Sequence, residues 1–208
     1  MAPQKLAWEQ KWRNLFSEVE RMVDYWLGRW GKIGVKSQKE RRGEDEIVWT
    51  ISWKDSKSAR TQLALSLGEE NGHRRIVLRQ PPFDLPAYRV TIERLHQERN
   101  MEAKWMEIGY FLEGLLRGLF LYAVGDELYS KLGCPNHVSD YGSGKRLCVK
   151  IGGRWFNYID FQLCDDGTFK WILPDLNGGG RWHIGGGEDD DPVALLMNAV
   201  KALALSFL

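Results

Sequence analysis

The spacing of the hydrophobic residues changes several times along this chain, and these changes limit the folds that it can adopt. Residues 4–30 carry large apolar side chains every three or four positions, the spacing of an amphipathic helix: Trp8, Trp12, Phe16, Val19, Val23, Trp26 and Trp30. In residues 47–53 the apolar residues instead alternate with others, which is typical of a half-buried strand. The helical spacing returns at about 90–132, and strand-like alternation follows it.

Turn signals divide the alternating regions into hairpins. Leu63, Leu65 and Leu67 alternate, and Asn71-Gly72 then supplies a tight turn. We therefore expect a first meander of three antiparallel strands, which the proline-rich run 81–86 ends. A second group of strands is expected at 147–151, 155–163 and 169–173, joined by the turns Gly152-Gly153 and 165–167, with a short edge strand at 182–184. Residues 32–45 and 134–145 are expected to be loops, and a break is expected near Gly125-Asp126.

This order of elements predicts the α+β class, with antiparallel sheet meanders and packed helices. We expect a single α+β domain over 1–208. Its halves, 1–88 and 89–208, resemble each other in outline, as a helix followed by three strands. The last segment, 192–208, is apolar around most of a helix, so something must cover it. The sequence leaves open whether this cover comes from the same chain or from another.

Residues 108–125 form the segment with the strongest membrane character. Glu113 and Arg117 lie in its middle, and each costs roughly 2.5–3.5 kcal/mol at a bilayer centre. A buried core helix is therefore expected, with the small residues Gly114 and Gly118 allowing another element to approach. The three cysteines form no metal-binding or disulfide pattern, and the first residues have no signal-peptide character. We expect a cytoplasmic protein.

The stretch LNGGGRWHIGGGEDDDP, residues 176–192, concentrates glycines and acids. Clustered carboxylates can bind Ca²⁺ or Mg²⁺, but the residues lack the spacing of a calcium-binding loop. Asp191 followed by Pro192 instead matches the N-cap and first position of a helix. We expect an edge strand, a loop and a capped helix here, with no metal.

Catalytic signatures are weak. The loop 139–146 contains GSGK but lacks the other residues of a phosphate-binding loop, and the four histidines are far apart. A metal-dependent nuclease is the most credible enzyme, with Asp160, Asp165 and Asp166 beside lysines on strands. Asp165 and Asp166 are better explained as turn residues. The sequence therefore predicts no catalytic residue and no cofactor.

Ten tryptophans and the absence of a catalytic pattern favour a non-enzymatic protein-interaction module, of adaptor or regulatory type, that binds another protein or its own copy. The second sheet is expected to have one polar face free for contact. The alternative is a nucleic-acid-binding or nuclease-like protein that uses the basic stretch 32–42 and carboxylates near 160–166. The candidate partner-binding residues are Trp26, Trp30, Trp49, Trp53, Lys36, Arg41 and Arg42.

Overall fold

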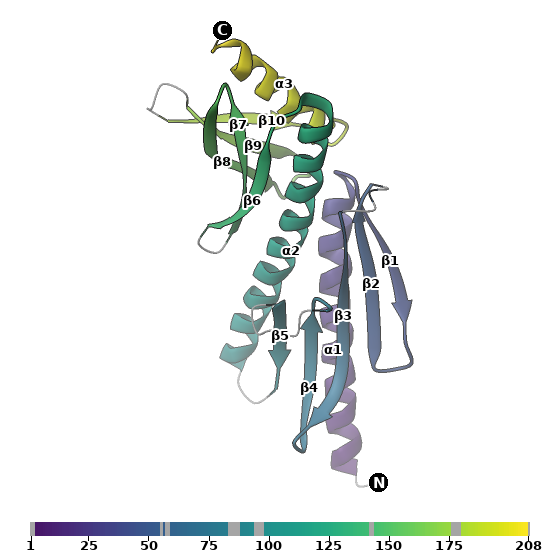
Figure 1. Cartoon of the computed structure of the whole chain (residues 1–208). Coiled ribbons are helices and arrows are strands. Elements are labelled where there is room, and N and C mark those ends of the chain that lie inside the picture. The colour runs from purple at the N-terminus through teal and green to yellow at the C-terminus, as the bar shows by residue number, and fades with distance from the viewer. Residues whose placement is uncertain are drawn as a thin grey trace. The chain divides into compact units, whose positions relative to one another are not determined.

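The computed structural model describes residues 3–54, 56, 59–82, 88–93, 98–141, 144–175 and 180–207. Within them the fold is α+β, with antiparallel sheets, as the hydrophobic spacing predicts. Its described elements follow the order helix, five strands, helix, five strands, helix (Figure 1). Each sheet is a meander, because its strands neighbour one another in sequence order.

The chain divides into two compact units. The first comprises 1–28, 36–52 and 60–113, and the second comprises 29–35, 53–59 and 114–208. Residues 89–113 thus belong to the first unit, and the boundaries after residues 28 and 113 fall within long helices.

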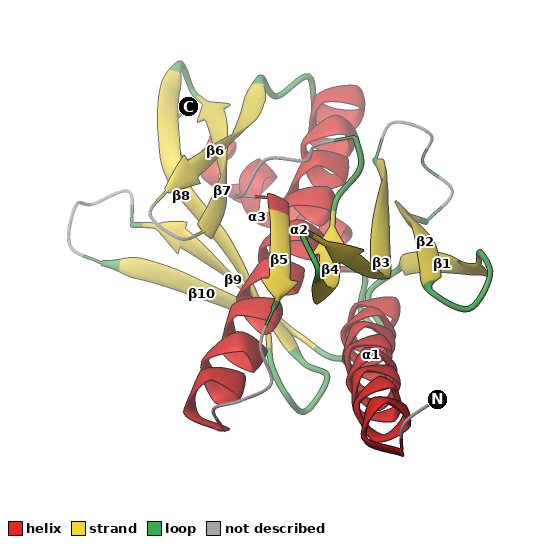
Figure 2. Ribbon diagram, turned by 90° about the horizontal axis from the view of Figure 1, so that it is seen from below, coloured by secondary structure: helices red, strands yellow, loops and turns green. Residues whose placement is uncertain are grey.

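In the first unit, helix α1 (Pro3–Gly31) runs along one face of the first sheet (Figure 2). This sheet consists of β1 (Val35–Arg41), β2 (Glu46–Trp53), β3 (Arg60–Glu70), β4 (His73–Arg79) and β5 (Arg89–Ile92). The predicted alternation is confirmed, because Ile47 pairs with Leu65 and Trp49 with Leu63, and all four side chains are buried. The hairpin turn is also confirmed, since Asn71 and Gly72 both have positive φ.

The second unit holds the C-terminal part of α2 (Glu98–Leu132), a sheet and α3 (Pro192–Leu205). Its sheet consists of β6 (Asn136–Tyr141), β7 (Gly144–Ile151), β8 (Arg154–Leu163), β9 (Phe169–Pro174) and β10 (Arg181–Gly186). The edge strand expected at 182–184 is confirmed as part of β10.

Aromatic rings around Phe120 of α2 form the centre of the second unit's core. The ring of Phe120 lies 4.4 Å from that of Phe161, 4.9 Å from Trp53, 5.6 Å from Trp171 and 6.0 Å from Trp30, measured between centroids. All five side chains are buried. The expectation that α2 includes a buried core segment therefore agrees with the side-chain burial.

Three expected loops or helical stretches contain strands instead. β1 lies in the expected loop 32–45, β6 in the expected loop 134–145, and β5 at the start of the expected helical region. The expected break near Gly125-Asp126 is wrong, because α2 continues to Leu132. Each meander consequently has five described strands rather than three or four.

The C-terminal helix has the predicted N-terminus. Asp191 is its N-cap, with the side-chain Oδ1 accepting a hydrogen bond of 2.9 Å from the backbone N–H of Val193, and Pro192 opens the helix. Val193, Leu196, Val200 and Leu203 are buried, and α3 contacts β7 and β10. One face of α3 is therefore covered within the chain. Residues 176–179 of the glycine-rich stretch lie outside the described residues.

Candidate interaction surfaces

The tryptophans proposed for partner binding are mostly in the core. Trp30, Trp49 and Trp53 are each 1% exposed, so in this structure they offer no area to a partner. Trp53 packs against Gly34, where an added Cβ would stand 3.0 Å from the indole ring. Trp26 is half-buried, and its ring makes an edge-to-face contact with Tyr25 at 6.5 Å.

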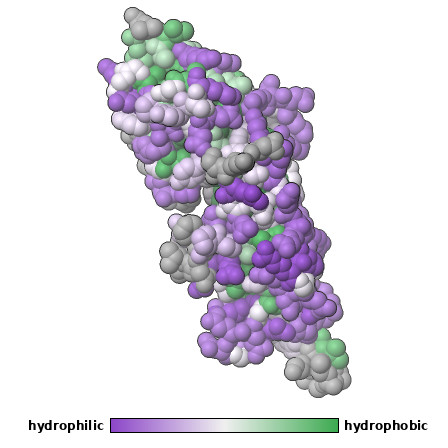
Figure 3. All heavy atoms as spheres, turned by 45° about the vertical axis from the view of Figure 1, so that its right-hand side comes forward, coloured by the Kyte–Doolittle hydropathy of each residue, from purple (hydrophilic) through white to green (hydrophobic). Residues whose placement is uncertain are grey.

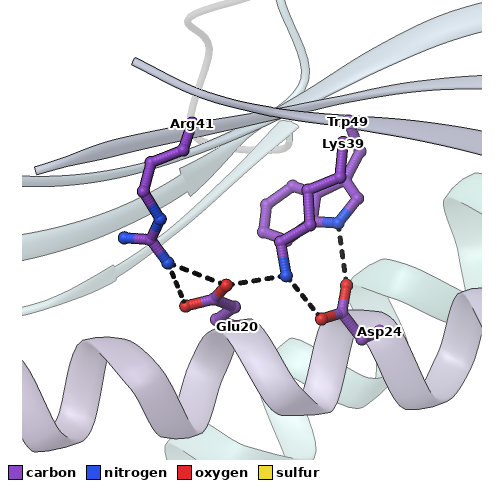
Figure 4. Close-up of polar contacts among 5 residues, drawn as sticks. All are labelled: Glu20, Asp24, Lys39, Arg41 and Trp49. Atoms are coloured by element: carbon purple, nitrogen blue, oxygen red, sulfur yellow. Dashed lines mark hydrogen bonds and ion pairs between the residues drawn. The ribbon is translucent and has the colours of Figure 1, made fainter. Parts of the chain in front are cut away.

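The basic residues of β1 take part in a polar network with α1 in the first unit (Figure 4). Glu20 of α1 accepts from Arg41 at 2.8 Å and forms an ion pair of 2.6 Å with Lys39. Lys39 also donates to Asp24 at 2.6 Å, and the other oxygen of Asp24 accepts from the indole N–H of Trp49 at 2.9 Å. Two carboxylates thus tie the exposed strand β1 and the buried Trp49 to the helix.

The charges of this network shift one another's protonation. Partial burial alone would raise the pKa of Glu20, but the hydrogen bonds and charges of Lys39 and Arg41 hold that pKa below its ordinary value. Burial would lower the pKa of Lys39, yet hydrogen bonds to Asp24 and Glu20 raise it. At neutral pH Glu20 and Lys39 are therefore both charged, and their contact is an ion pair.

We expect Glu20→Gln to reduce the free energy of unfolding by about 1 kcal/mol at neutral pH, because it removes charge-assisted hydrogen bonds at a partly exposed site. A lowered folded-state pKa stabilises the fold above the unfolded-state pKa, and this stabilisation is lost as the pH falls through the folded-state pKa. The variant should therefore show a flatter dependence of stability on pH in the acidic range. Urea unfolding at several pH values tests this, and parallel pH curves for variant and wild type would contradict it.

Other cations of the basic stretch also have acidic neighbours. Arg42 pairs with Glu40 at 3.1 Å, and in the second unit Lys32 pairs with Glu188 at 3.3 Å. Lys36 is exposed on β1. Much of the positive charge of 32–42 is thus compensated within the chain.

The carboxylates considered for a nuclease have structural contacts. Asp160 pairs with Arg117 of α2 at 3.6 Å, and Asp165 pairs with Arg29 at 3.1 Å. Asp166 accepts hydrogen bonds from the hydroxyl and backbone N–H of Thr168, and these lower the pKa of Asp166. Asp165 and Asp166 thus lie in the predicted hairpin turn. No group of three or more His, Cys, Asp or Glu side chains suited to a metal ion occurs in the part of the chain that the structure describes.

Exposed aromatic residues occur on α2, part of which the sequence predicts to be a buried core helix. In the second unit, Tyr122 is 53% and Tyr129 63% exposed. Asp126 is exposed between them, and spacings of four and three residues put all three on one helix face. We call this set the tyrosine stripe. The sequence does not predict this set, because the apolar segment 108–125 is expected to be a buried core helix.

Two further surfaces of the second unit carry apolar side chains. On α3, exposed apolar residues include Ala194, Ala202 and Leu205, and Figure 3 shows apolar atoms gathered at this end. On the second sheet, Trp155 is 46% exposed, and its ring lies 5.1 Å from that of His137. The sheet therefore has an exposed aromatic side chain on β8.

In the part of the chain that the structure describes, one helix, 101–132, could span a membrane by length and composition alone, and 61% of its most apolar window is buried. A core helix passes the same test, so this finding assigns no membrane role.

No protein-family model matches the chain, and no similar protein was found among the curated proteins or the solved structures.

Proposed function

We propose that this protein is a non-enzymatic protein-interaction module whose partner binds the tyrosine stripe of α2. The observation that carries the proposal is the exposure of Tyr122 and Tyr129, more than half each, on one face of a regular helix. On the opposite side of the same helix, Phe120 and Val124 are fully buried. The core thus holds the helix in place while the two rings project from it.

Tyrosine suits this role for a physical reason. Its ring provides a large contact area, its hydroxyl can hydrogen-bond, and few rotatable bonds must be fixed on binding. Such residues dominate the affinity of many protein interfaces.

The nucleic-acid alternative receives less support at the basic stretch. Lys39 and Arg41 already bind Glu20, and Lys32 and Arg42 each have an acidic partner. A phosphate would have to displace these carboxylates to gain the same contacts. A nuclease activity has less support than nucleic-acid binding, because Asp160 and Asp165 are paired with arginines.

The double substitution Tyr122→Ser, Tyr129→Ser is expected to weaken partner binding by at least about tenfold, since each aromatic anchor removed from an interface commonly costs more than 1 kcal/mol. Light scattering after size-exclusion chromatography first shows whether the partner is a second copy. If the wild-type protein is monomeric, the proteins that the wild type and the double variant each retain from the same cell extract are compared. Tyr110→Ser, a 70% exposed position of the same helix in the first unit, is the matched control.

A protein or second copy retained by wild type and by Tyr110→Ser, but lost by the double variant, is the expected result. Equal retention by all three would contradict the tyrosine stripe as the binding site. A monomer whose absorbance ratio at 260 and 280 nm is high until a salt wash would instead support nucleic-acid binding. The adaptor or regulatory role and the cytoplasmic location remain predictions.

A further inference from the structure

We propose a second binding site, for a short acidic segment of a polypeptide, on the outward face of the second sheet. This site is separate from the tyrosine stripe and does not depend on it. The strands, charges and exposed aromatic pair that form it all lie within the second unit.

The strand register determines which side chains share this face. Residues paired across antiparallel strands lie on the same side, and alternate residues of a strand lie on opposite sides. His137 pairs with Cys148, Lys150 with Trp155, and Gln162 with Lys170. A β-bulge between β7 and β8 adds a residue, so that Phe156 and Ile159 both take the side opposite Trp155. The described residues of this cation-bearing face that have side chains are His137, Ser139, Arg146, Cys148, Lys150, Trp155, Asp160, Gln162, Lys170, Ile172, Pro174, Arg181 and His183.

Charge is strongly segregated onto this face. Residues 101–208 contain more acidic than basic residues, yet four basic side chains lie here, from Arg146, Lys150, Lys170 and Arg181. The single carboxylate on the face, among the described side chains, is Asp160, and it pairs with Arg117. Lys150 and Arg181 are exposed, and neither forms a salt bridge with a described residue. Lys150 and Arg181 therefore give this face positive charge that is not paired with a described carboxylate.

Trp155 gives the same face an apolar contact. Its indole is 46% exposed beside Lys150 and touches the His137 ring edge-on at 5.1 Å. A ligand that fits must thus combine negative charge with one apolar group. An acidic peptide segment with a hydrophobic side chain has this combination.

The borders of the face favour a short peptide over a nucleic acid. Asp165 and Asp166 follow β8, Asp175 follows β9, and Glu188 and its acidic neighbours follow β10. A phosphate backbone that extends past the sheet meets these carboxylates, and charge repulsion acts within a Debye length of about 8 Å at physiological salt. A short acidic peptide can stay within the cation-bearing face.

The test measures fluorescence anisotropy of a short labelled peptide of glutamates around a central leucine, with labelled oligothymidine of similar length as the competing ligand class. We expect the peptide to bind more tightly than oligothymidine and to weaken as salt rises. Lys150→Glu with Lys170→Glu should reduce its affinity by about tenfold, because two attractions become repulsions, at one exposed and one half-buried position. Lys201→Glu, at an exposed cation of α3, is the matched control and should change the affinity less than about twofold.

Trp155→Ser separates the apolar contact from the charge. It should weaken binding of the leucine peptide but not of a peptide with glycine in place of the leucine. The Tyr122→Ser, Tyr129→Ser variant should bind the peptide as the wild type does. Tighter binding of oligothymidine, no measurable peptide binding, or equal losses in the Lys201→Glu control would each overturn the proposal.

Discussion

Replacing Trp171 with alanine is expected to lower the free energy of unfolding by about 3–5 kcal/mol, the usual range for deleting a buried aromatic side chain. Trp171 is fully buried on β9, and its ring lies 4.9 Å from that of Phe161 and 5.6 Å from that of Phe120. Its indole N–H donates a hydrogen bond of 2.8 Å to the backbone carbonyl of Pro192, at the start of α3. The substitution therefore leaves a cavity in the core and removes the buried hydrogen bond to the Pro192 carbonyl.

Urea unfolding followed by circular dichroism measures this loss. Trp155→Ala is the control in the same sheet, because its side chain is already 46% exposed and should cost no more than about 1 kcal/mol. Similar losses for the two variants would show that the aromatic core does not depend on Trp171 as the structure indicates. A loss of helical circular dichroism at low urea concentration in Trp171→Ala, but not in Trp155→Ala, would further support the contact between Trp171 and the start of α3.

The second large effect concerns two glycines of α2 that should respond in opposite directions to the same substitution. An alanine Cβ at Gly125 would stand 2.3 Å from Oδ1 of Asn136, whose amide donates to the carbonyls of Gly125 and Cys134. The side chain cannot move without losing these bonds, so Gly125→Ala should destabilise the protein by about 1–3 kcal/mol. At Gly114 an added Cβ meets nothing within 4 Å.

Gly114→Ala is consequently expected to stabilise the protein by about 0.5–1 kcal/mol, because alanine restricts the unfolded backbone and favours the helix. Thermal and urea unfolding of both variants give the comparison. Stabilisation by Gly125→Ala would contradict the close approach of β6 to α2. Destabilisation by Gly114→Ala would show that the space beside Gly114 is filled.

Most of the secondary structure could be predicted where burial repeats with a clear period. The helix 3–31 and the strands around Ile47, Leu65 and Trp171 each place large apolar side chains on one side, so the period identifies the element. Strand β1 has no such signal, because six of its seven residues are exposed. It is held by pairing in the sheet and by the ion pairs of Lys39 and Arg41 to Glu20, more than ten residues away.

Strands β5 and β6 were missed for related reasons. β5 has only four residues and follows the proline-rich run 81–86 of the sequence. β6 has the composition of a loop, with Asn136, Ser139 and Asp140 among its six residues. Edge strands gain stability from backbone hydrogen bonds to one neighbour, and these bonds leave little trace in the side-chain pattern.

The candidate surfaces were predicted less well than the elements. A tryptophan provides a large apolar contact area in a core as well as in an interface. The number of tryptophans therefore could not distinguish Trp53, which is 1% exposed, from Trp155, which is 46% exposed. The polar alternation around Asp160 predicts a polar face on the second sheet. Which charges gather on that face depends on the register of five strands and on one β-bulge.

The sequence by itself therefore determined the α+β class, the long helices, the main hairpins and the N-cap of α3, because these depend on local spacing and on single capping or turn residues. Only the tertiary structure decided which aromatic side chains are buried, which basic residues are compensated, and which face of the second sheet is positive. Those properties arise from residues far apart in the chain, whose proximity is determined by packing and strand register.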